Sequence, residues 1–404
     1  MISSPPVPRL CHWFSRLASA LDPRSAPRLA WLFVGAVLAR GRRTVTGWIR
    51  AAGLSGEYRT CYTTVAAVGK KADLIAAHLA HEVVKPLVAG ADRLTFALDD
   101  TPTERAGRQV QGAGVHHNPT PGPAGSAFVY GHVWVVLGLL VAHPVWGIVA
   151  LPLLARLYVR EKNLPAIPPK HRPAFRTKLE LGVELVRWAK CWLGMLGKPL
   201  WVVADGAYAT TPFLKPMRAL AVTVVSRLRR DAHLRTVPTV RSGKPGRPRI
   251  YGEHRIDLAK RGGQRRGWGT GTFTLYGKVT VKRYKTFVAT WRPAGGSVRV
   301  VLVDEPAGWV AFCCTEASAT VAEVLGCISG RFSLDIDHPN CHPSDRVSAA
   351  TRTDYDRCTG AVDPLPMVPP AARVTPRRSL MPGRRVRPVP PRLHRPHRGR
   401  YPHR

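Results

Sequence analysis

The chain has 404 residues, which is enough for two or three domains with at least one sizeable core. It carries 61 Lys and Arg against 25 Asp and Glu, a formal net charge of +36. Such an excess repels itself unless a polyanion neutralises it, so nucleic acid is the first expected partner and an acidic membrane surface the second. Because the 8 cysteines form no CxxC pair and no signal-peptide core is visible, we expect free thiols in a reducing compartment, without a zinc site or disulfide framework.

Residues 1–90 are predicted to be helical, because stretches such as ADLIAAHLAHEVVKPLVAG (72–90) repeat apolar residues at helical spacing. Within this region, GRRTVTGWIRAAGLSGEYRT (41–60) fits a DNA-binding helix-turn-helix. A helical bundle that makes no DNA contact explains the same pattern equally well. The sequence therefore leaves both roles open for this region.

Apolar strands are predicted after residue 91. The stretch VWVVLGLLVAHPVWGIVALPLLARLYV (133–159) resembles a membrane span, but Pro144 and Gly147 divide it into runs too short to cross a bilayer as helices. Two strands buried on both faces and joined by a turn explain the stretch better. We therefore expect no membrane association.

The order of the elements predicts a mixed α/β sheet. A long Gly- and Pro-rich stretch, 110–128, is expected to be irregular. The rest gives three strands, a helix, a strand, a helix and a strand, which is the element order of a ribonuclease-H-like sheet flanked by helices. These segments are 94–100, 131–143, 145–160, 174–194, 199–209, 213–220 and 221–229.

Residues 231–310 differ from the rest in charge and in pattern. Alternating stretches there predict antiparallel strands, and the segment from Arg241 to Arg292 holds fourteen Lys or Arg and two acids. A further helix is predicted from Thr320, where Thr320 and Glu323 form a capping box. The tail after Pro364 holds Pro and Arg without a single acid, so it is predicted to be disordered.

Acidic residues stand at the ends of two predicted strands. Asp99 and Asp100 end LTFALDD, and Asp205 ends PLWVVAD. In a sheet of this order the first and fourth strands are neighbours, so Asp99 and Asp205 are expected at one edge of the sheet. Two carboxylates placed so closely need a cation between them, and Mg²⁺, which takes one or two carboxylates, suits.

A third acid is expected from the last helix. Asp335 lies three residues after Phe332 and seven after Ile328, so it shares their inward face in a helix. A solvated acid at a frayed helix end explains Asp335 equally well. Strand alternation turns Asp100 away from Asp99, and Asp100 remains the alternative first acid.

Several blocks of the chain resemble bacterial insertion-sequence transposases of the Asp-Asp-Glu (DDE) superfamily. These are LDDTPTERAG, GAGVHHNPTPGPA, FVYGHVWVVL and LPLLARLYVR, followed by VVADGAYA, VVSRLRRDA and GKPGRPRIYG. The resemblance runs over residues 25–335. It implies a ribonuclease-H-like catalytic domain with a β-rich insertion before the helix that carries the third acid. It also implies Mg²⁺-dependent cleavage at transposon ends, with Mn²⁺ as a substitute, followed by strand transfer into target DNA. The active form implied is a homodimer in the bacterial cytoplasm, associated with the nucleoid when it is bound to DNA.

By this resemblance Asp99, Asp205 and Asp335 are the three catalytic, metal-binding acids. The family's last helix reads Arg-Phe/Trp-x-Ile-Glu, so the shorter Asp335 stands where glutamate is expected and could place its carboxylate differently. The following Lys of the family is replaced by His342, and the Arg- and Pro-rich tail has no counterpart there. We therefore hypothesise a frameshifted or decayed copy that has lost activity.

Basic residues near the predicted core are expected to contact DNA phosphates, although a solvated face or a plain basic loop would show the same composition. The stretch KPGRPR (244–249) resembles a short hook that enters narrow A·T minor grooves. His116 and His117 lack spaced acids, so a structural or DNA-contacting role is preferred to a metal site. The nucleic-acid-binding residues predicted are Arg227, Arg229, Arg230, Lys244, Arg247 and Arg249.

Two other classes of protein remain compatible with the sequence. One is a nucleic-acid-binding protein without catalysis, and the other is a nuclease of the same fold that cuts DNA without joining it. The predicted division of the chain is an N-terminal helical region (1–90), the first part of the catalytic core (91–230), the basic β-rich insertion (231–310), the last catalytic helix (311–340) and the disordered tail (341–404).

Overall fold

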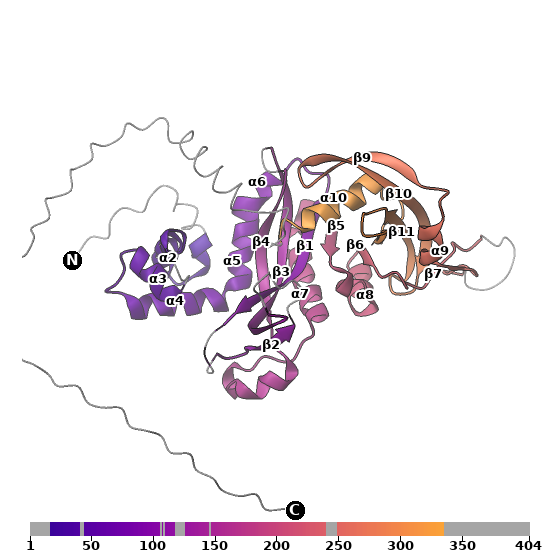
Figure 1. The fold of residues 1–404 in the computed structure, drawn as a ribbon. Coiled ribbons are helices and arrows are strands. Elements are labelled where there is room, and N and C mark those ends of the chain that lie inside the picture. Colours follow the sequence, from indigo (N-terminus) through magenta and orange to yellow (C-terminus); the bar gives the residue numbers. More distant parts are fainter. Residues whose placement is uncertain are drawn as a thin grey trace, which may run out of the picture. The chain divides into compact units, whose positions relative to one another are not determined.

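The computed structural model describes residues 17–40, 44–105, 107, 110–117, 126–144, 147–239 and 249–334. This part is mixed α/β, with helices flanking one sheet, as predicted for a ribonuclease-H-like fold (Figure 1). The strands are β1 Leu94–Glu104, β2 Gly114–His117, β3 Phe128–His143, β4 Gly147–Tyr158, β5 Leu200–Ala204, β6 Thr223–Leu228, β7 Leu234–Arg235, β8 Arg255–Ile256, β9 Gly269–Leu275, β10 Lys278–Trp291, β11 Gly296–Val303 and β12 Val310–Cys314. The α-helices are α2 Ala26–Leu38, α3 Val45–Ala51, α4 Tyr58–Lys70, α5 Ala72–Leu79, α6 Lys85–Leu87, α7 Lys178–Leu193, α8 Thr211–Ala219, α9 Leu258–Gly263 and α10 Val321–Arg331.

The centre of the sheet has the predicted arrangement of strands. β1 pairs antiparallel with β3 and parallel with β5, and β5 pairs parallel with β6. The strands predicted from 94–100 and 199–209 are therefore neighbours. Their register pairs Leu98 with Ala204.

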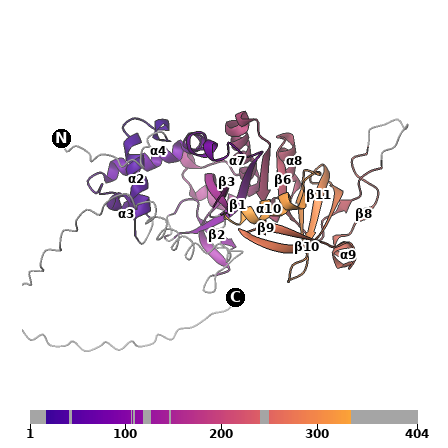
Figure 2. The same cartoon turned by 90° about the horizontal axis from the view of Figure 1, so that it is seen from above.

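The basic insertion contributes further strands to the same sheet. β12 pairs with β6, and the order continues through β11, β10, β7 and β8. β9 and β10 form a hairpin whose turn residues, Tyr276 and Gly277, have φ values of 54° and 71°. Positive φ at both turn positions matches the twist of a two-residue hairpin. One face of this hairpin lies beside α10 (Figure 2).

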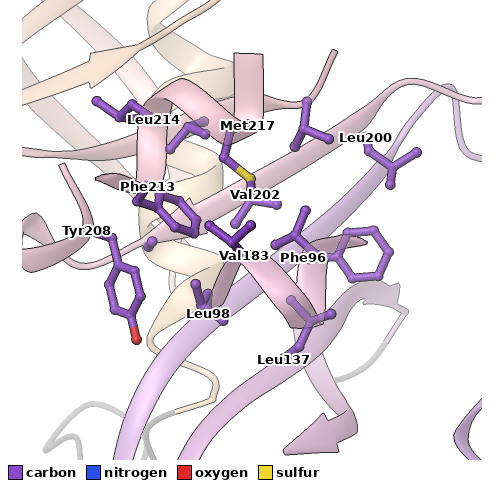
Figure 3. Packing of buried hydrophobic residues seen from close by; sticks show 14 of the residues in the cluster. Phe96, Leu98, Leu137, Val183, Leu200, Val202, Tyr208, Phe213, Leu214 and Met217 are labelled. Atoms are coloured by element: carbon purple, nitrogen blue, oxygen red, sulfur yellow. The ribbon is translucent and has the colours of Figure 1, made fainter. Parts of the chain in front are cut away.

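Two apolar clusters cover opposite faces of the central strands, because successive side chains of a strand point to opposite faces. Phe96 and Leu98 of β1 pack with α7 and α8, in the cluster that also buries Val183 (Figure 3). Ala97, between them, belongs to the second cluster, together with Ile328 of α10. The α7 face and the α10 face of β1 therefore carry alternate residues.

Capping boxes set where two of these helices begin. Thr320 and Glu323 form the predicted box at the start of α10. The predicted start of the other helix at residue 174 is wrong, because the side chain of Thr177 accepts the N–H of Glu180 and α7 begins at Lys178. Phe175, inside the predicted segment 174–194, lies before the helix and is 40% exposed.

The described residues before position 91 are largely helical, as the apolar spacing predicts. α2, α3 and α4 pack around Leu32, Ile49 and Cys61. Thr44 caps α3 by accepting the N–H of Gly47. These three helices thus share a small core of their own.

Two expectations for the stretch between β1 and α7 were wrong. Within 110–128, which was expected to be irregular, residues 114–117 form β2, which pairs with β3. Gly114 lets the backbone of β2 approach the side chain of Asn163, because a Cβ at this position would lie 2.1 Å from Asn163 Nδ2. β4 is not buried on both faces, because most of its side chains are half-buried and two are exposed. No helix within the described ranges is long and apolar enough to cross a membrane.

Candidate active site

Asp99 lies on the α10 face of β1. Its backbone neighbours Leu98 and Asp100 face the other side, where Leu98 is fully buried against α7 and α8. The Asp99 carboxylate forms an ion pair with Arg331, the last residue of α10. The two side chains are only 19% and 12% exposed, so little water screens this pair.

Asp205 follows the last residue of β5. Since Leu98 pairs with Ala204, Asp99 and Asp205 come next on neighbouring parallel strands, and alternation turns both toward the α10 face. The carbonyl of Asp205 accepts the Ser226 hydroxyl at 3.0 Å and the Tyr208 N–H at 2.9 Å. Asp205 is exposed, and no described residue pairs with its carboxylate.

Asp100 occupies the α7 face instead. Its Oδ1 accepts the Tyr208 hydroxyl at 2.6 Å, and its Oδ2 accepts Lys178 Nζ at 2.8 Å. Burial raises the pKa of the Tyr208 hydroxyl, and the negative charges of Asp100, Asp99 and Asp205 raise it further. The Tyr208 hydroxyl therefore stays protonated and acts as a hydrogen-bond donor, and all three carboxylates contribute to its raised pKa.

The third predicted acid, Asp335, lies outside the described residues. The last described residue, Leu334, is buried on the α10 face, and a Cβ at Gly138 of β3 would lie 2.9 Å from its Cδ1. Among the side chains that are described, no group of three His, Cys, Asp or Glu could hold a metal ion. The hard carboxylate oxygens of Asp99 and Asp205 fit a divalent cation, and Asp99 already pairs with the cationic guanidinium of Arg331. A metal site built on these two carboxylates needs at least one further ligand.

The predicted arginines at the end of β6 and directly after it differ in their partners. Arg227 is exposed, and its guanidinium has no partner among the described residues. Arg229 pairs with Asp231 at 3.0 Å, whereas Arg230 stacks 4.8 Å from the Trp309 ring centroid and donates to the Trp309 carbonyl. A cavity of about 410 Å³ beside Asp205 is lined by Gly206, Arg227, Leu228, Arg229, Arg230 and Asp231.

The remaining predicted contacts are only partly described. Lys244 and Arg247 lie outside the described residues, and Arg249 pairs with Glu253. His116 is 8% exposed on β2, and its Nε2 has no hydrogen-bond partner in the described part of the chain. Burial lowers the pKa of the His116 imidazole, and the nearby charge of Arg160 lowers it further. These features agree with a structural role for His116.

Sequence reasoning did not find the residues that surround the acids. Lys178 was read only as part of an amphipathic helix, and Tyr208 only as part of a strand. The one signal was the order Asp-Gly-Ala-Tyr, which puts Tyr208 one short turn after Asp205. The partner of Arg331, 232 residues away in the chain, could come only from the fold.

Comparison with known families identifies the superfamily of the chain. A family model described as DDE superfamily endonuclease matches residues 16–292, more than half of the chain. The chain therefore belongs to the DDE superfamily of endonucleases, whose members act on DNA as transposases or nucleases and generally use divalent metal ions. The match includes Asp99 and Asp205 and ends before α10. No protein with a curated description matches the chain.

Proposed function

We propose that the chain is a DDE-type transposase that cleaves DNA at transposon ends and transfers the freed 3′ ends into target DNA. The observation that carries this proposal is the register of β1 and β5: Asp99 and Asp205 directly follow the paired residues Leu98 and Ala204, and strand alternation directs both toward the α10 face. Two carboxylates that meet at one edge of a sheet favour a cation between them. Membership of the endonuclease family makes DNA the matching substrate.

The proposed metal ligands are Asp99, Asp205 and Asp335, with Mg²⁺ as the cofactor and Mn²⁺ as a substitute. When bound, the metal supplies an activated water or 3′-hydroxyl and a counter-charge for the leaving oxygen. The sheet holds the first two carboxylates on neighbouring strands. Arg331 neutralises Asp99 in the metal-free chain, and its release would free a guanidinium beside the scissile phosphate.

DNA phosphates are proposed to enter beside Asp205, over the basic cavity after β6. Arg227 is the best-placed contact, because its exposed guanidinium has no partner among the described residues. Arg229 is held by Asp231, so its charge is partly neutralised within the chain. A phosphate bound here would lie next to the second acid, as cleavage requires.

The N-terminal helices are proposed to bind the transposon end. α4 exposes Arg59, Thr63, Ala66 and Lys70 along one side, while the opposite side packs on α2 and α3. A polar, small-residue face with two cations suits the major groove of DNA. Only Arg59 of this face lies within 41–60, so the proposed surface continues beyond the predicted helix-turn-helix to Lys70.

The test is a strand-transfer assay with duplexes that carry the element's terminal repeats, a supercoiled target plasmid and Mg²⁺. Joined products would support the transposase. Cleaved but unjoined ends would support a nuclease of the same fold, and bound but intact ends a nucleic-acid-binding protein. Asp335→Glu restores the residue expected by the resemblance. If this variant cleaves the ends and the natural chain does not, the natural chain is a decayed copy.

A further inference from the structure

The residues around Asp100 form a connection between the two strands that carry the proposed metal ligands. Both oxygens of Asp100 are engaged on the α7 face, Oδ1 by the Tyr208 hydroxyl and Oδ2 by Lys178 Nζ. Asp99, its neighbour in β1, faces α10 and Arg331. Asp100 therefore cannot reach the α10 face without giving up two charge-assisted hydrogen bonds.

Tyr208 is fixed at both ends. Its backbone N–H donates to the carbonyl of Asp205, at 2.9 Å, and closes the short turn after β5. Its side chain is 2% exposed, and the ring packs edge-on against Phe213 with centroids 5.2 Å apart. A Cβ at Gly182 of α7 would lie 3.0 Å from this ring, so little room is left for another orientation. In Figure 3 the hydroxyl points away from the apolar side chains.

Lys178 completes the arrangement from a third element. It is the first residue of α7, directly after the capping residue Thr177, so the start of the helix fixes its backbone. Its ammonium group neutralises Asp100, which removes the repulsion that a second free carboxylate beside Asp99 would cause. Two hydrogen bonds therefore link β1 to the turn after β5. Asp100 accepts the Tyr208 hydroxyl, and the Tyr208 N–H donates to the carbonyl of Asp205.

We infer that Asp100 and Tyr208 are positioning residues that hold the Asp99 and Asp205 carboxylates at the separation a divalent cation needs, acting from the opposite face of the sheet. The inference rests on the proposed function, because it assigns Asp99 and Asp205 as metal ligands. Asp100, the alternative first acid, is not a ligand on this account. Residues that orient metal ligands typically change metal affinity about 10-fold or more when they are mutated.

The test measures Mn²⁺ binding to the full chain without DNA, by the loss of the free Mn²⁺ signal in electron paramagnetic resonance. Tyr208→Phe keeps the buried ring and removes only the hydroxyl, so it should weaken Mn²⁺ binding about tenfold. Asp100→Asn should weaken it similarly, and the double variant should be no worse than either single one, because both remove the same connection. Tyr284→Phe is the matched control, since that ring also packs edge-on, 5.7 Å from Phe273, but lies on the hairpin.

Three results would overturn the inference: Tyr208→Phe with natural affinity, loss of binding in Asp100→Asn alone, or additive effects in the double variant. The second result would make Asp100 a ligand. Amide hydrogen exchange of residues 205–209 without metal gives an independent measure, because the positioning role predicts faster exchange there in Tyr208→Phe and not in Tyr284→Phe. A natural chain that binds no Mn²⁺ would refute the proposed function. If the amide exchange of residues 205–209 were then also unchanged in Tyr208→Phe, the positioning role would be refuted separately.

Discussion

Arg331 and Asp99 form an ion pair that joins the end of α10 to the middle of β1. The pair links residues 232 positions apart and leaves both side chains less than one-fifth exposed. A guanidinium therefore contacts the first proposed metal ligand. Any cation that binds Asp99 must compete with Arg331 for the same carboxylate.

Arg331→Gln should consequently have two opposite effects. It removes the guanidinium that neutralises the Asp99 carboxylate in a poorly hydrated site, so the free energy of unfolding should fall by about 3 kcal/mol. Mn²⁺ should bind several-fold more tightly, because its competitor is gone. Urea unfolding with and without Mn²⁺ measures both effects in one experiment.

The matched control is Arg93→Gln. Arg93 also lies on the α10 face, where it pairs with Glu323 and stacks 4.0 Å from the Trp201 ring centroid, but it touches no proposed ligand. It should lose stability without any gain in Mn²⁺ affinity. Equal or weaker Mn²⁺ binding by Arg331→Gln would contradict competition at Asp99.

Arg227→Ala should weaken binding to DNA regardless of its sequence. Arg227 lines the cavity beside Asp205 and has no partner among the described residues, so its loss should remove one phosphate contact and lower the slope of log affinity against log salt by about 1. Fluorescence anisotropy with a labelled duplex at several salt concentrations gives this slope. Asp231→Asn frees Arg229 from its partner and should change the slope in the opposite direction.

Thr320→Ala should destabilise the protein by about 1 kcal/mol, because it removes one half of the capping box that starts α10. The effect matters for the site, since α10 carries Arg331. Thr320→Ser keeps the capping oxygen and should retain nearly all the stability. Equal losses in both variants, measured by urea unfolding, would show that the methyl group and not the cap is responsible.

His116 should make stability depend on pH. Burial and the nearby charge of Arg160 lower the pKa of its imidazole in the folded state, so the unfolded chain binds the proton more readily. The stability that neutral His116 contributes is present above about pH 6.5 and is lost as pH falls through the lowered folded pKa. In His116→Leu, the drop in unfolding free energy between about pH 7.5 and about pH 5 should be smaller than in the natural chain. An equal drop would exclude His116 as its source.

The sequence was sufficient to predict the centre of the sheet, whereas the catalytic role of Asp99 and Asp205 stays a prediction. Long apolar runs that end in Asp99 and Asp205 have one plausible place in a sheet of this element order, and β1 and β5 are indeed parallel neighbours. Helix starts were predicted where the capping pattern was read, at Thr320, and missed by four residues where it was not, at Thr177.

The interactions that surround the acids could not be predicted in the same way. Tyr208, Lys178 and Asp100 meet only because three elements pack together, and no local spacing records that packing. β2 was missed because Gly and Pro dominate its surroundings, although Gly114 is what allows the strand to approach Asn163. Local pattern therefore predicted positions along the chain, and tertiary contacts decided the partners.

The most direct test of the account is metal-dependent nicking of a supercoiled plasmid that carries the element's ends. The natural chain should nick it only with Mg²⁺ or Mn²⁺, and Asp205→Asn should lower the rate at least about 100-fold, because a metal ligand is lost. Asp92→Asn, which changes an exposed acid two residues before β1, should nick like the natural chain. Unchanged nicking by Asp205→Asn, or a natural chain that binds these ends without nicking them, would contradict the account.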